Sequence, residues 1–265
     1  MPPAGPDGSD RLGTAPSWRS ILSRGLLNTF VTIVSATATY LGACCLALIV
    51  YIGAFPPLTG VQLQRSIEAT VSGSDHGRRY EPVPLSRIDR NLPLAVVAGE
   101  DSRFFLHWGI DWTEVGNAIE AYRRGEPLRG ASSITQQLVK NLFLTTHSTY
   151  LRKALEVPLT VAAELLLSKR RILELYLNVI EWGPGVYGAE AAVQYHYGTS
   201  ARHLTRRQAA RLAACIPNPL VRRPQTVGRY QYVILRRMAQ IGRLPLSSAP
   251  SRPPPSVHAS VLPRP

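Results

Sequence analysis

The chain has 265 residues and a formal net charge of +13, because 30 lysines and arginines stand against 17 acidic residues. A hydrophobic fraction of 45% excludes a fully disordered protein, and three cysteines exclude both a disulfide-rich scaffold and a structural zinc site. The length allows one medium domain with extra segments or two small domains.

The positive charge is unevenly distributed. Only three basic residues are lysines, Lys140, Lys153 and Lys169, and twelve arginines but no carboxylate follow Glu190. Such a basic region suits nucleic acid, anionic lipid headgroups or a phosphate-bearing substrate. An ammonium is compact and a guanidinium is a planar fork, so the retained lysines indicate positions where this geometry matters, unless they are relics of codon bias.

The N-terminal part predicts a membrane anchor. Residues 1–24 read as a disordered cytoplasmic tail, and residues 25–55 carry no charge and are mostly apolar. About 20 such residues cross a bilayer as a helix, whereas a cleaved signal peptide has an apolar core of only about 7–15. We therefore expect an uncleaved transmembrane helix rather than a buried core helix. Arg19 and Arg24 lie nearest the span and favour a cytoplasmic N-terminus with the domain outside.

The remainder predicts one helical domain. Residues 56–83 read as a short juxtamembrane connector, 84–244 as the domain and 245–265 as a Pro-rich tail. Apolar spacing predicts helices and no strands, and Pro158 is expected to kink or break the longest helix. The expected helices cover 92–98, 113–122, 133–143, 149–168, 170–179, 189–197 and 205–215.

The first candidate site residues are Glu100 and Asp101, which follow an apolar helix. A carboxylate in that position is partly desolvated, so its pKa rises and it suits a proton carrier. An exposed helix end is the alternative. His107 lies two helical turns further on and fits a structural role as well as a catalytic one.

A second candidate lies at 130–137, where a glycine and two serines precede a helix. A serine cap leaves free backbone amides that can receive an anion, although an ordinary helix cap has the same pattern. Gln136 and Lys140 share one face of this helix, and Gln137 is offset from them.

Two further segments carry charges on helices. Arg152 and Lys153 suit phosphate contacts and Glu156 a second carboxylate, although a surface ion pair explains Arg152 and Glu156 equally well. Two carboxylates on separate helices are typical of glycosidic chemistry. Glu174 and Asn178 share a face of the next helix, which also reads as a plain amphipathic helix.

In this order, these segments resemble the family-51 glycosyltransferases, the peptidoglycan glycosyltransferases. Serine at 133 and glutamine at 208 stand where the family more often has threonine and glutamate. Neither Ser-x-x-Lys nor Lys-Thr-Gly occurs, which argues against a transpeptidase half. The motifs are EDSRFFLHWGID from Glu100, GASSITQQ from Gly130, RKALE from Arg152 and KRRILELYLN from Lys169, with EWGPGVYG from Glu181 and IPNP from Ile216 typical of the monofunctional branch.

The resemblance implies an all-α, lysozyme-like domain behind a single anchor helix. It implies polymerisation of lipid II, a disaccharide-pentapeptide on undecaprenyl pyrophosphate, into β-1,4 glycan strands during bacterial cell wall biogenesis. The growing strand is the donor, lipid II is the acceptor, and the configuration inverts. The expected location is the bacterial plasma (inner) membrane, with the domain on the periplasmic side.

The resemblance also implies roles for single residues. Glu100 resembles the general base that takes the proton of the acceptor 4-hydroxyl, and Glu156 the second glutamate, near the pyrophosphate or a Mg²⁺ or similar divalent cation. No organic cofactor is implied. The implied partners are lipid II, the glycan chain, membrane lipids and cell-wall synthesis or division proteins, without nucleic acid. Contacts to pyrophosphate and sugar are expected from Asp101, His107, Ser132, Thr135, Gln136, Gln137, Lys140, Arg152, Lys153 and Asn178.

Three other functions compete with this interpretation. A lytic transglycosylase shares the fold but needs no pyrophosphate site, which leaves Lys140, Arg152 and Lys153 without a role. A membrane-anchored basic protein that binds nucleic acid or anionic lipid leaves the four ordered motifs unexplained. A catalytically silent scaffold would not need both Glu100 and Glu156.

Overall fold

The first element is a long helix, α1 (Trp18–Val50), in which the stretch Gly25–Val50 is long and apolar enough to cross a membrane. The computed structural model describes residues 18–73, 77–127, 130–147 and 149–246, with the backbone alone for 18–24. The hydroxyls of Thr29, Thr32 and Thr39 each donate to the carbonyl oxygen four residues earlier. These polar side chains are therefore satisfied within the helix, which is compatible with insertion into a bilayer.

The chain divides into two compact units, Met1–Ala43 and Cys44–Pro265. Much of the two expected tails, at 1–17 and 247–265, lies outside the described residues. Helix α1 begins before the expected boundary at residue 25 and ends before residue 55. It ends there because residues 51–54 turn and Pro56 and Pro57 follow, which cannot continue a helix.

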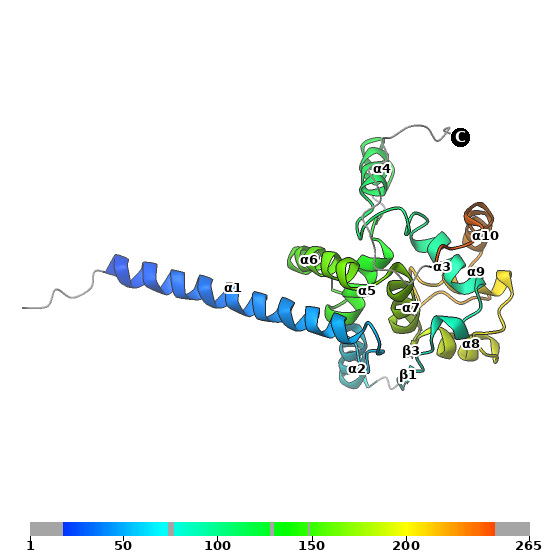
Figure 1. The fold of residues 1–265 in the computed structure, drawn as a ribbon, viewed down its shortest axis with the longest axis horizontal. Helices are drawn as coiled ribbons and strands as arrows, with labels where there is room; N and C mark the ends of the chain where they lie inside the picture. Colours follow the sequence, from blue (N-terminus) through cyan, green and yellow to red (C-terminus); the bar gives the residue numbers. More distant parts are fainter. Residues whose placement is uncertain (1–17, 74–76, 128–129, 148, 247–265) are drawn as a thin grey trace, which may run out of the picture. The chain divides into compact units, whose positions relative to one another are not determined.

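The second unit is mostly helical, as the sequence predicts (Figure 1). All seven expected helices are present with small shifts of their ends, and the longest runs through Pro158 without a break. The helices of the domain are α3 (Asn91–Glu100), α4 (Trp112–Arg123), α5 (Ile134–Phe143), α6 (Tyr150–Leu166), α7 (Lys169–Val179), α8 (Ala189–Tyr197), α9 (Arg206–Ala213) and α10 (Tyr230–Ile241), with the 3-10 turn η1 (Leu85–Arg87).

Two helices form the centre of this unit. Every residue of α7 from Ile172 to Val179 is buried, and so is every residue of α3 from Leu92 to Ala98. Helix α3 packs on α9 and α10, and α5 packs on both α6 and α7. The C-terminus of α3 and the N-terminus of α5 are therefore fixed by different partners, and both carry candidate site residues.

The segment 56–83 is not a simple connector. It contains the helix α2 (Gly60–Ser72), which packs on α5, and the strand β1 (Arg79–Tyr80). The strand joins a small sheet in the order β1-β3-β2, parallel to β3 (Val186–Tyr187), which is antiparallel to β2 (Glu181–Gly183). The expectation of no strands was wrong because segments this short show no alternation and are stable only when a distant partner pairs with them.

Candidate active site

Glu100 is the last residue of α3. Burial raises the pKa of its carboxyl above the ordinary value, which confirms the prediction for a carboxylate at the end of an apolar helix. Gln137 Nε2 donates to Glu100 Oε2 at 2.9 Å, and this bond opposes the shift because it stabilises the anion. A carboxyl in this state exchanges its proton closer to neutral pH than an exposed one, as a general base requires.

Helix α10 holds the end of α3 in place. The Tyr230 hydroxyl donates to the carbonyl oxygen of Gly99 at 2.9 Å, and Arg237 Nη1 donates to that of Ala98 at 3.2 Å. Both bonds satisfy carbonyl groups of the last helical turn, where a cation is also favoured by the helix dipole. Tyr230 and Arg237 lie far from Glu100 in sequence, so no local pattern could have identified them.

A cavity of about 470 Å³ opens beside Glu100. Its walls come from the first motif, from the loop before α5 and from α10, so segments distant in the sequence form one site. The lining includes Glu100, Asp101, Arg103, Ser132, Tyr230 and Arg237.

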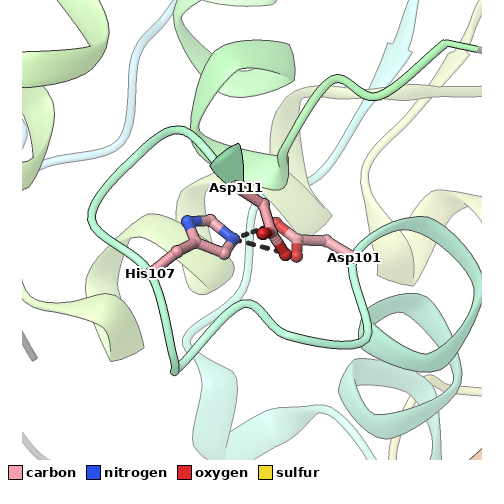
Figure 2. Close-up of side chains that lie close together, drawn as sticks. All are labelled: Asp101, His107 and Asp111. Atoms are coloured by element: carbon pink, nitrogen blue, oxygen red, sulfur yellow. Dashed lines mark hydrogen bonds and ion pairs between the residues drawn. The ribbon is translucent and has the colours of Figure 1, made fainter. Parts of the chain in front are cut away.

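Asp101 and His107 bind each other (Figure 2). His107 Nε2 lies 3.0 Å from both carboxylate oxygens of Asp101, and the amide of Ile134 donates to Asp101 Oδ2 at 3.0 Å. This pair therefore fastens the first motif to the N-terminus of α5. Both side chains are largely buried and have this structural role, while Asp101 also lines the cavity, so the expected substrate contacts of Asp101 and His107 stay a prediction.

Asp111 lies next to this pair in Figure 2, but it too is already bonded. It accepts from Arg103 Nε at 3.0 Å and caps α4 by accepting from the amide of Glu114 at 3.1 Å. One potential ligand atom from each of Asp101, His107 and Asp111 lies within 4.8 Å of the others. His107 Nδ1 points away from both carboxylates, however, and Asp111 is bonded to Arg103 and Glu114 rather than to this pair, so the three side chains do not form an open ligand set.

The second motif forms a capped helix start. Ser133 accepts from the amide of Gln136 at 3.1 Å, and Gln136 Oε1 accepts from the amide of Ser133 at 3.1 Å. The Ser133 hydroxyl also donates to the carbonyl of Gly109. Gly109 has a φ of +77°, and a Cβ there would lie 2.6 Å from Thr160 Cγ2, so only glycine fits. Gln136 therefore has a structural role in this capping box through its Oε1, and its expected role in substrate binding stays a prediction.

Thr135 is also structural. Its hydroxyl donates to Glu164 Oε1 at 2.6 Å, and Lys169 Nζ lies 2.7 Å from the same oxygen. Thr135 and Glu164 are fully buried, and the Lys169 ammonium stacks on Phe104 at 4.4 Å from the ring centroid. The expectation that Thr135 contacts substrate is therefore corrected, and the third lysine of the chain belongs to the core of the domain.

Asn178 ties two segments of backbone together. Its side chain accepts from the amide of Val83 at 2.9 Å and donates to the carbonyls of Val83 and Glu174 at 2.9 and 2.8 Å. It is fully buried, so it holds the chain before η1 against α7. This arrangement also corrects the expectation that Asn178 binds substrate.

The third motif forms a cluster of charges on α6. Glu156 is only 2% exposed, and its two oxygens bind Arg152 Nη1 and Lys153 Nζ, the latter at 2.7 Å. Lys153 Nζ also donates to Ser132 Oγ at 3.2 Å, and Arg152 Nε donates to the carbonyl of His147 at 2.7 Å. The ion pair of Arg152 and Glu156 is therefore part of a network rather than an isolated surface pair.

Lys140 links the two glutamates electrostatically. Burial lowers the pKa of its ammonium, while Glu156 and Glu100 both act to raise it. The Lys140 ammonium has no hydrogen bond or ion pair with any residue that the structure describes, so its three donors are available to a ligand. The structure thus gathers Glu100, Gln137, Ser132 and the cations Lys140, Arg152 and Lys153.

The residues around Glu156 do not fit a Mg²⁺ site. Magnesium prefers carboxylates that are free to coordinate it, in an octahedral shell of oxygens. Both oxygens of Glu156 are bound to cations, and Lys140 adds a third positive charge nearby. The ammonium and guanidinium groups around Glu156, rather than a metal ion, would therefore neutralise the charge of a pyrophosphate.

Comparison with known proteins gives a consistent result. The family model described as Transglycosylase matches residues 65–239. The chain is 44% identical over 191 residues to the biosynthetic peptidoglycan transglycosylase of Pseudomonas fluorescens (strain SBW25), covering 71% of this chain and 80% of the relative. It is 46% identical over 187 residues to the protein of the same name from Chromohalobacter salexigens, covering 69% and 80%. A third, from Pseudomonas putida (strain GB-1), is 40% identical over 222 residues, covering 82% and 94%.

Proposed function

The chain belongs to the transglycosylase family, and we propose that it is an inverting peptidoglycan glycosyltransferase that polymerises lipid II. One observation carries the chemistry of this proposal. Gln137 Nε2 lies 2.9 Å from Glu100 Oε2 and 3.5 Å from the carbonyl oxygen of Ser132, whose hydroxyl accepts from Lys153 in the cation cluster around Glu156. This arrangement supports a proton acceptor beside a group of cations suited to a pyrophosphate.

The reaction follows from this arrangement. The 4-hydroxyl oxygen of lipid II attacks the anomeric carbon of the growing strand, and its proton passes to Glu100. The bond from that carbon to the pyrophosphate oxygen breaks on the opposite face, so the α-linked donor yields a β-1,4 bond. Lys140, Arg152 and Lys153 neutralise the charge that develops on the departing undecaprenyl diphosphate.

The anchor suits this substrate. Lipid II stays in the bilayer, so a spanning helix keeps the enzyme at a high local concentration of substrate. We place the protein in the bacterial plasma (inner) membrane with a cytoplasmic N-terminus and the catalytic domain outside, since Arg19 and Arg24 lie nearest the span on the N-terminal side. Basic residues close to anionic lipid each add about 1 kcal/mol to membrane binding. Other cell-wall synthesis or division proteins are candidate partners on the same side.

The substitution Glu100→Gln tests the proposal. It keeps the shape of the side chain but removes the proton acceptor, so polymerisation of labelled lipid II should fall by about 10²–10⁴-fold with lipid II binding retained. Glu81→Gln, at an exposed position, is the matched control and should have the parent rate. Polymer that lysozyme digests, formed at near the parent rate by Glu100→Gln, would exclude Glu100 as the base.

A further inference from the structure

A chain of two hydrogen bonds runs from the core of the domain to Glu100. The Tyr176 hydroxyl on α7 donates to Gln137 Oε1 at 2.7 Å, and Gln137 Nε2 on α5 donates to Glu100 Oε2 at 2.9 Å. Tyr176 is fully buried and does not line the cavity. Among the described residues, its hydrogen-bonded connection to Glu100 runs through the amide of Gln137.

The amide of Gln137 is held in one orientation. Its nitrogen lies 2.9 Å from the carboxylate of Glu100 and 3.5 Å from the carbonyl oxygen of Ser132, two acceptors that favour a donor between them. A flipped amide would direct its oxygen at both of these acceptors, which is unfavourable. In the observed orientation the amide oxygen of Gln137 faces the interior, where an unpaired acceptor is costly, and the Tyr176 hydroxyl donates to it.

We infer that Tyr176 is a positioning residue, which holds the Gln137 amide so that its N–H remains bonded to the catalytic carboxylate of Glu100. This inference rests on the proposed role of Glu100 as the base. Without the hydroxyl, the amide oxygen of Gln137 lacks its donor, and the ammonium of Lys140, three residues further along α5, is an alternative donor on the same helix. The amide would then turn away from Glu100.

Several groups determine the pKa of the Glu100 carboxyl. Burial raises the pKa of its carboxyl, and the hydrogen bond from Gln137 lowers it. The other charged groups that act on it are Lys140 and Arg222, which lower the pKa, and Asp101, which raises it. The Tyr176 and Tyr230 hydroxyls stay neutral because burial raises their own pKa values. Loss of the Gln137 bond leaves these groups in place, so the pKa of Glu100 should rise further.

The test compares Tyr176→Phe with the parent enzyme, using labelled lipid II over a range of pH. A hydrogen bond to an ionised group is worth about tenfold or more, so the acid limb of the rate profile should move up by about one pH unit, and kcat measured on that limb should fall about tenfold. KM should change by less than about twofold, because Tyr176 does not touch substrate.

Two further variants separate positioning from simple structural loss. Tyr187→Phe removes the hydroxyl of another buried tyrosine, next to Glu181, and should leave the acid limb unchanged. In a Gln137→Ala background, Tyr176→Phe should cause no further shift, because the chain of hydrogen bonds is already broken. If Tyr176→Phe fails to fold, Gln137→Ala alone should give the same shift of the acid limb.

The outcomes are distinguishable. An unshifted acid limb in Tyr176→Phe overturns the role of Tyr176. If Tyr176→Phe does not fold, an unshifted acid limb in Gln137→Ala overturns it instead. In either case, an inactive Glu100→Gln leaves the assignment of Glu100 as the base intact. An active Glu100→Gln overturns the base assignment itself, and with it this inference. Additive pH shifts in the double variant also overturn it, since they show that Tyr176 acts on Glu100 by another route.

Discussion

Lys153 and Ser132 are joined by a hydrogen bond of 3.2 Å from Nζ to Oγ, which ties the N-terminal part of α6 to the loop before α5. The same ammonium lies 2.7 Å from Glu156 Oε2, while Arg152 binds the other oxygen of that carboxylate. The Lys153 ammonium thus bridges the second and third motifs, and the Arg152 guanidinium already binds the other carboxylate oxygen of Glu156.

This bridge predicts that lysine and arginine are not equivalent at position 153. A guanidinium is wider and prefers two parallel bonds, so it would displace either the Ser132 contact or Arg152. We expect Lys153→Arg to lower kcat/KM for lipid II about tenfold although the charge is kept, and Lys153→Ala to lower it further.

The substitution Arg206→Lys, at an exposed position, serves as the control. It should leave the rate of polymerisation unchanged and the free energy of unfolding within about 0.5 kcal/mol of the parent. If Lys153→Arg polymerises lipid II at the parent rate, the geometry of this cation is unimportant and the lysines reflect codon usage.

The pH dependence of kcat/KM should be bell-shaped and narrow. Glu100 must be ionised to accept a proton, and burial raises its pKa above the ordinary 4.5, so activity is lost as the pH falls through that raised value. Lys140 must be protonated to meet the pyrophosphate, and burial lowers its pKa below the ordinary 10.5, so activity is lost as the pH rises through that lowered value. Lys140→Arg stays protonated and should move only the alkaline limb to higher pH. An alkaline limb at the same pH in this variant would assign it to another group.

Asn178→Ala should affect stability rather than substrate recognition. It leaves the buried amide and carbonyl of Val83 without their partners, which we expect to cost about 2–4 kcal/mol of unfolding free energy. Thermal unfolding in detergent measures the loss, and Asn117→Ala on the exposed face of α4 is the control. A KM for lipid II raised tenfold at unchanged stability would restore a substrate contact to Asn178.

The end of the anchor helix should contribute to the stability of the catalytic domain. Leu48 is fully buried, and the Arg171 side chain donates to the carbonyl oxygens of Tyr51 and Ala54, each at 2.7 Å. Removal of residues 1–43 keeps these contacts, whereas removal of 1–57 deletes them. The shorter protein should polymerise lipid II more slowly in detergent and unfold at a lower temperature.

A single substitution gives the same test in the full chain. Leu48→Ala should cost about 2–5 kcal/mol, as a buried leucine does elsewhere. Leu46→Ala, at an exposed position two residues away, is the matched control and should unfold at the parent temperature in the same detergent. Equal unfolding temperatures for the two truncated proteins would show that the segment acts only as a tether.

Several elements were predictable because their signal is local. The uncharged stretch before Pro56 predicts a helix long and apolar enough to cross a membrane, as the structure has at Gly25–Val50, and helical periodicity located α3 to α9. The desolvation of Glu100 also follows from its own neighbours, since the apolar residues before it must be buried and leave it at the edge of the core. The motif that begins at Arg152 likewise marks the cation cluster, since its members are three or four residues apart on one helix.

What the sequence by itself determined is therefore the long apolar helix, the helical class, the desolvated carboxyl of Glu100 and the cations near Glu156. Only the tertiary structure decided which motif residues face the cavity and which face inward. Periodicity places Thr135 and Asn178 on helices, but their partners, Glu164 and Val83, are known only once the chain has folded. The same holds for Tyr176, whose hydroxyl is an ordinary core group until α5 brings Gln137 between it and Glu100. The physical reason is that a buried polar side chain must be satisfied by whichever group the fold places beside it, and that group is most often distant in the sequence.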